Sequence, residues 1–169
     1  MRRVFWPLVA LAGLLAACSV SFTIPLPDQT VQLPALGGTL GRVVYPAQAQ
    51  SFPPPGGVLK DVQVTGTLEA SQPLFLTLDL YARTKDPAQD ENCLALGGYA
   101  YACALGPEDG PIGRASFAGT SAPLSLKGEK LTQGVQEGRL WLGAMVQGLP
   151  NGGLTLTFKN LKATLTLGL

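Results

Sequence analysis

Leu154 to Leu167 read LTLTFKNLKATLTL, the stretch of this chain that says most about its fold. Apolar residues occupy the even positions as far as Phe158 and the odd positions from Leu161 onward. Alternation with a period of two predicts a β-strand with one buried face, and a slip of one residue turns every side chain to the other face. We therefore predict a β-bulge or a tight turn near Lys159-Asn160-Leu161.

The same alternation recurs upstream in several segments. It is present in residues 19–26, 58–70, 74–80 and 139–147. Because a Ser-Gln-Pro turn at residues 71–73 separates two of these segments, we predict that residues 58–70 and 74–80 form an antiparallel hairpin.

Shorter strands are predicted at residues 39–45, 123–126 and 130–135, within a chain that shows no sustained helical spacing. Residues 31–57 otherwise look like a long connection. About eight strands separated by frequent turns, in a chain with 21 Gly and 14 Pro, are typical of an all-β protein. We predict an antiparallel β-sandwich, with a small β-barrel as the alternative, and the length favours a single domain.

Composition excludes several classes of function. Histidine is absent, and this removes the usual general base near neutral pH and the commonest metal ligand. The formal net charge is only +1, so the chain lacks the basic surface that nucleic-acid binding requires. Acid-base hydrolysis through carboxylates such as Glu69 and Asp79 ranks last, because no paired-acid context raises a pKa. We predict neither an enzyme nor a cofactor.

The N-terminus has the organisation of an export signal. Two arginines follow Met1, residues 4–14 form an apolar run too short to span a bilayer, and Leu15-Ala16-Ala17-Cys18 comes next. Small residues immediately before a cysteine resemble the lipobox of bacterial lipoprotein precursors. The alternative is an ordinary secretory signal with Cys18 incidental.

The resemblance to lipoprotein precursors implies that residues 1–17 are removed and that Cys18 is lipidated, leaving residues 18–169 as one lipid-anchored β domain. Loss of Arg2 and Arg3 leaves 10 basic against 11 acidic side chains, a net charge of −1. Two or more acyl chains would attach this nearly neutral domain stably to a membrane. Since Ser19 is not the Asp that resembles an inner-membrane retention signal, we place the protein at the outer membrane if the host has one.

Two cysteines remain once Cys18 is assigned to lipid. A three-residue hairpin loop at residues 97–99 would place Cys93 directly opposite Cys103, in a compartment where disulfides persist. We predict a disulfide between them, which should stabilise the fold by about 3 kcal/mol in the chain-entropy model. A redox or metal site fits less well, because only two cysteines are present and their spacing is wide.

Two further groups of residues are candidates for ligand contact. Acidic side chains near the cysteines could hold calcium, although their spacing differs from the EF-hand pattern and an acidic loop is usually only solvated. Aromatic side chains could stack on sugar rings, as in carbohydrate-binding sandwiches, or could pack against another sheet. The acids are Asp86, Asp90 and Glu91, and the aromatic residues are Tyr81, Tyr99, Tyr101 and Trp141.

From these observations we predict a non-enzymatic, membrane-anchored lipoprotein of the cell envelope. Its β domain would bind an envelope protein or support an assembly, with the membrane contacted through the anchor. The alternative is a lipoprotein that binds carbohydrate or another envelope polymer through Tyr and Trp side chains. An exposed row of aromatic rings would favour that alternative.

Overall fold

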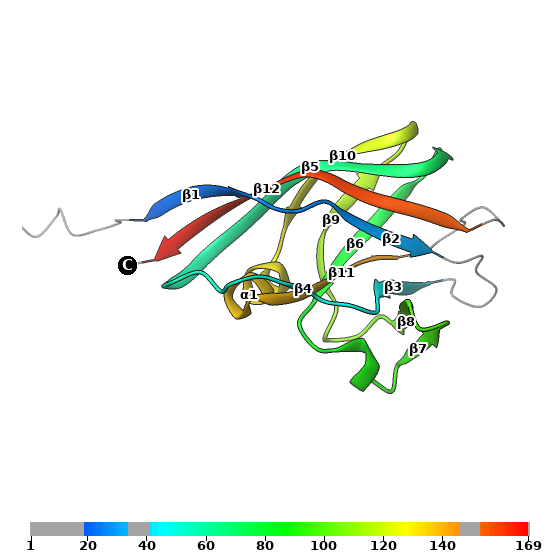
Figure 1. The fold of residues 1–169 in the computed structure, drawn as a ribbon, viewed down its shortest axis with the longest axis horizontal. Helices are drawn as coiled ribbons and strands as arrows, with labels where there is room; N and C mark the ends of the chain where they lie inside the picture. Colours follow the sequence, from blue (N-terminus) through cyan, green and yellow to red (C-terminus); the bar gives the residue numbers. More distant parts are fainter. Residues whose placement is uncertain (1–18, 34–40, 146–152, 169) are drawn as a thin grey trace, which may run out of the picture.

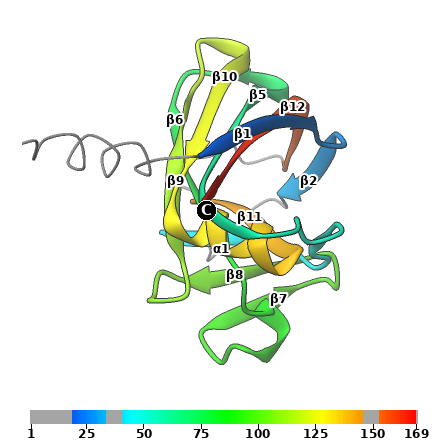
Figure 2. The same ribbon diagram turned by 90° about the vertical axis from the view of Figure 1, so that its left-hand side faces the viewer.

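The computed structural model describes residues 19–33, 41–145 and 153–168. Its strands form two antiparallel sheets that pack face to face, which confirms the predicted all-β sandwich (Figures 1 and 2). The five-stranded sheet has the order β1-β12-β5-β10, and β2 pairs with the other half of β12. Its strands are β1 (Val20–Pro25), β2 (Gln29–Leu33), β5 (Val58–Leu74), β10 (Gly119–Lys127) and β12 (Leu154–Gly168).

The seven-stranded sheet has the order β7-β8-β3-β11-β6-β9, and the two-residue strand β4 also pairs with β11. A 3₁₀ turn, η1 (Pro87–Gln89), lies between β6 and β7. The strands are β3 (Arg42–Pro46), β4 (Gln50–Ser51), β6 (Thr77–Arg83), β7 (Cys93–Leu96), β8 (Ala100–Ala104), β9 (Gly110–Ser116) and β11 (Arg139–Met145). β3 confirms the predicted strand at residues 39–45 over the described residues 42–45, whereas β4 lies in the stretch predicted as connection.

The predicted irregularity in the C-terminal strand is confirmed as a bulge. The pairing of β12 with β5 shifts between Lys159 and Lys162, and Asn160 adopts a left-handed backbone with φ of 52°. Both apolar sets therefore face the same core, since Phe158 and Leu161 are each buried.

The predicted hairpin of residues 58–70 and 74–80 is wrong. β5 continues through the Ser-Gln-Pro segment to Leu74, and β6 lies in the other sheet. The buried residues occupy even-numbered positions from Val62 through Leu68 to Leu74. The alternation is therefore unbroken, and the strand continues as far as Leu74. The connection between β5 and β6 is thus a crossover between the two layers.

The predicted strand at residues 130–135 is also wrong, because the helix α1 (Glu129–Glu137) occupies this position. Leu131 and Val135 are one helical turn apart and are both buried, and Gly138 ends the helix with φ of 72°. The helix covers one end of the sandwich, close to the start of β5 (Figure 2).

The main core lies between the sheets, and a smaller cluster lies on the outer face of the seven-stranded sheet. Neighbouring residues of one strand serve both clusters, as Val44 faces the main core while Val43 and Tyr45 face the smaller one. β1 is less covered than its alternation predicts, since Val20 and Phe22 stay 54% and 39% exposed.

Candidate functional site

A buried arginine organises the outer face of the seven-stranded sheet. Arg83 ends β6, has no exposed surface and pairs with the carboxylates of Asp90 and Asp109. Its Nη1 donates to the Sγ atoms of Cys93 and Cys103, each at 2.9 Å. A charge removed from water is tolerated only when it is paired and hydrogen-bonded in this way.

Tyr45 completes the arrangement from β3. Its hydroxyl donates to Oδ1 of Asp109 at 2.7 Å, and Arg83 lies 5.3 Å from its ring centroid in a cation–π contact. Burial, followed by the negative charge of Asp109, raises the pKa of Tyr45, so the phenol stays protonated. Oδ2 of Asp109 accepts a further bond from the backbone N–H of Gly106. We call Tyr45, Arg83, Asp90 and Asp109 the arginine cluster.

The arginine cluster holds a disulfide-linked hairpin. Cys93 and Cys103 are bonded and lie directly opposite each other in the pairing of β7 with β8, as predicted. The hairpin turns through residues 97–99, with Gly97 and Gly98 at positive φ. Because Arg83 contacts both sulfurs, the hairpin is fixed to the body of the sheet by side chains as well as by its strand pairing.

The predicted aromatic residues do not form one exposed row. Tyr81, Tyr101 and Trp141 belong to the smaller cluster on the outer face of the seven-stranded sheet, where Trp141 is only 2% exposed. Arg139 lies 5.2 Å from the Trp141 ring centroid. Tyr99, at the turn of the hairpin, is 46% exposed and is the most accessible of the four.

The acidic side chains suggested for calcium have other partners. Asp90 pairs with Arg83, and Oδ1 of Asp86 accepts a hydrogen bond from the N–H of Ala88 at the start of η1. Glu91 is exposed in the adjoining turn. The described part of the chain contains no group of three or more Asp, Glu, Cys or His side chains that could hold a metal ion.

Glutamine side chains line a hollow of about 420 Å³ beside the hairpin turn. Gln29, Gln48, Gln50 and the exposed ring of Tyr99 contribute to it, and its lining includes no charged residue. Nε2 of Gln50 is buried and has no hydrogen-bond partner among the residues that the structure describes. A buried donor without a partner costs free energy unless a water or a ligand accepts from it. Periodicity could not have identified this site, because its residues come from three separate loops and strand ends.

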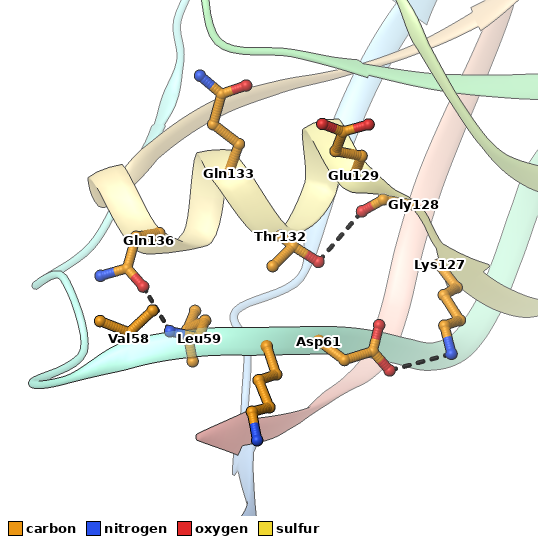
Figure 3. Close-up of a pocket in the computed structure, with 10 residues that line it drawn as sticks. Val58, Leu59, Asp61, Lys127, Gly128, Glu129, Thr132, Gln133 and Gln136 are labelled. Atoms are coloured by element: carbon orange, nitrogen blue, oxygen red, sulfur yellow. Dashed lines mark hydrogen bonds and ion pairs between the residues drawn. The ribbon is translucent and has the colours of Figure 1, made fainter. Parts of the chain in front are cut away.

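A second hollow, of about 680 Å³, lies between α1 and the beginning of β5 (Figure 3). Gln136 joins the two elements: its Oε1 accepts from the N–H of Leu59 at 2.7 Å, and its Nε2 donates to the carbonyl of Gly57. Lys127, just before α1, and Asp61 on β5 form an ion pair of 3.0 Å at the other end of the hollow (Figure 3). Val58, at the mouth, is 72% exposed.

The predicted signal and anchor, residues 1–17 and Cys18, lie outside the described residues. The described chain begins at Ser19, and β1 starts one residue later. No helix within the described ranges is long and apolar enough to cross a membrane.

Comparison with family models, with curated proteins and with solved structures finds no match for this chain.

Proposed function

We propose that this protein is a lipid-anchored binding module of the cell envelope, attached through Cys18 and placed at the outer membrane where the host has one. The observation that carries the proposal is the lipobox-like Leu15-Ala16-Ala17-Cys18, after which only Ser19 precedes the first strand of the sandwich. The disulfide between Cys93 and Cys103 supports it, because such bonds persist in oxidising compartments outside the cytoplasm.

The anchor is tested by replacing the cysteine. Cys18→Ser is expected to abolish acyl labelling and to move the protein from the membrane fraction to the soluble fraction. Cys93→Ser with Cys103→Ser is the matched control, since it removes the other two cysteines of the chain but leaves the anchor. An unmodified Cys18 in the intact mass of the wild-type protein would contradict the proposal.

The β7–β8 hairpin is best suited to binding a protein partner. β7 is an end strand of its sheet, so one of its edges is unpaired among the described strands, and Leu94 on it is 51% exposed. An extended segment of a partner could add to this edge through main-chain hydrogen bonds. The disulfide and Arg83 hold the edge in place before binding, which lowers the entropic cost of association.

Cross-linking in the native envelope, followed by mass spectrometry, tests the partner. A photo-reactive residue at Leu94 should capture a protein, whereas the same residue at exposed Phe75, in the connection between β5 and β6, should not. Capture at Phe75 alone, or of lipid only at both positions, would contradict binding at the hairpin.

The glutamine-lined hollow favours a second candidate, the binding of an uncharged carbohydrate of the envelope. Amide groups match the donors and acceptors of sugar hydroxyls, and Tyr99 offers a ring face for stacking. Titration with neutral envelope oligosaccharides should shift NMR resonances of Gln50 and Tyr99. Tyr99→Ala should abolish the shifts of the Gln50 resonances, whereas the control Leu105→Ala should preserve them. If the Gln50 shifts survive Tyr99→Ala, the oligosaccharide binds elsewhere.

A further inference from the structure

The end of the sandwich nearest to Cys18 carries apolar side chains that the fold leaves uncovered. Val20 lies opposite Leu167 in β12, and Leu167 in turn lies opposite Leu59 in β5. Directly paired residues share a face of the sheet, so Val20 and Phe22 point to the same side as buried Leu165. These positions are patterned for burial, yet the second sheet does not cover them.

Val58 adds a third exposed apolar side chain at this end. It pairs with Gly168 on the rung next to that of Val20, Leu167 and Leu59, so it lies at the same end of the sheet as Val20 but on the other face. It also contributes to the lining of the hollow beside α1. Figure 1 shows the start of β1, the start of β5 and the C-terminus at one end of the molecule. We call Val20, Phe22 and Val58 the anchor-end surface.

The short spacing to Cys18 limits how far this surface can lie from the membrane. Two residue steps allow at most about 7 Å between the α-carbons of Cys18 and Val20. A lipidated Cys18 sits at the bilayer interface, whose polar region is itself several ångströms thick on each side. Ser19 alone is too short to act as a flexible tether.

We propose that the anchor-end surface lies against the bilayer, with Val20, Phe22 and Val58 in contact with the interfacial region. This inference rests on the lipid anchor proposed above. The lining of the adjoining hollow carries as many cations as anions, Lys60 and Lys127 against Asp61 and Glu129. The contact is therefore apolar, and we expect it to depend little on salt or on anionic lipid. The β7–β8 hairpin lies away from this end of the molecule (Figure 1), so it stays available to partners in this orientation.

Fluorescence quenching by brominated lipids tests the contact. Full-length precursor is expressed and processed, and the mature lipidated protein is reconstituted into vesicles of brominated phosphatidylcholine. Phe22→Trp and Val58→Trp are expected to lose most of their added emission relative to unbrominated vesicles. Phe75→Trp is the control, because Phe75 is 82% exposed and follows the far end of the 17-residue strand β5, about 50 Å from Val58 along an extended strand.

The design separates this inference from the anchor itself. Intact mass and flotation with vesicles show first whether Cys18 carries lipid, and an unlipidated protein would overturn the proposed function together with this inference. A lipidated, floating protein whose Phe22→Trp and Val58→Trp probes are not quenched would overturn only the contact. Equal quenching of Phe75→Trp would also overturn it, because the domain would then have no preferred end against the membrane.

Discussion

Arg83 is the residue whose loss should cost the fold most. Its guanidinium balances Asp90 and Asp109 within the arginine cluster, so Arg83→Met leaves two carboxylates without their cation. Breaking a buried ion pair from one side costs about 3–5 kcal/mol of unfolding free energy. Urea denaturation of the wild type and of Arg83→Met measures this loss.

The matched control for Arg83 is Arg114, which pairs with Asp79 on the exposed face of the sheet. Arg114→Met should cost about 1 kcal/mol or less, because solvent screens exposed pairs. Equal losses in the two variants would show that burial of Arg83 does not matter.

Asp90 should make the stability depend on pH in the acid range. The N–H of Asn92, followed by the Arg83 guanidinium, holds the pKa of Asp90 below its ordinary value, against the effect of burial. A carboxyl whose pKa is lower in the folded state stabilises the fold above its unfolded pKa, about 4, and loses that contribution as the pH falls through the folded value. The wild type should therefore exceed Asp90→Asn in urea midpoint at pH 7, and the difference should shrink below about pH 4. A difference that persists unchanged to pH 2 would contradict this linkage.

At the scale of elements, the bulge in β12 depends on a left-handed backbone at Asn160. Asparagine tolerates this conformation, whereas a β-branched residue does so at a cost of about 1–2 kcal/mol. We expect Asn160→Val to lower the free energy of unfolding by that amount, and Asn160→Gly to leave it nearly unchanged. The hydrogen bond that the backbone N–H of Asn160 donates to Oδ1 of Asp28 remains possible in both variants. An equal loss in Asn160→Gly would show that the side chain matters instead.

The sequence predicted elements that local patterns specify. The bulge followed from the parity change on either side of Asn160, and the Cys93–Cys103 bridge followed from the spacing around a three-residue turn. Both features depend on neighbouring residues alone, which explains why they could be predicted without the rest of the fold.

The incorrect predictions concern information that alternation does not contain. A period of two indicates which face of a strand is buried but not which sheet holds it, so β5 and β6 were assigned to one hairpin instead of two layers. In α1, a spacing of four between Leu131 and Val135 fits both a strand and a helix. Gly138, just after the last helical residue, was the signal in favour of the helix.

The candidate site was less predictable than the fold, because it joins residues that are distant in the sequence. Arg83 has no feature in the sequence that marks it as buried, and its partners Tyr45 and Asp109 are 38 residues before and 26 residues after it. The pairing of β3 and β6 with β11 brings Tyr45 to Arg83, and the pairing of β6 with β9, which begins directly after Asp109, brings Asp109 to the same place. Burial of Trp141 depends on the same face, so its role as a core residue emerged only with the sheet.

At the scale of the whole molecule, the two clusters share their strands. β3 sends Val44 to the main core and Tyr45 to the smaller cluster, and β11 divides Leu142 and Trp141 in the same way. Disruption of either cluster should therefore disturb the strands that hold the other. We therefore expect the molecule to unfold as a single cooperative unit in spite of its two layers of packing.

Cooperative unfolding can be tested with probes that report different parts of the molecule. Trp141 is the one tryptophan after Cys18, so its fluorescence reports the smaller cluster, whereas far-ultraviolet circular dichroism reports both sheets. We expect the two urea transitions of the processed protein to coincide, as they do when a domain unfolds in one step. Arg83→Met should lower both midpoints together, because the strands that hold Arg83 also line the main core. A Trp141 transition at clearly lower urea than the circular dichroism transition would instead show that the hairpin and its cluster open independently of the sandwich.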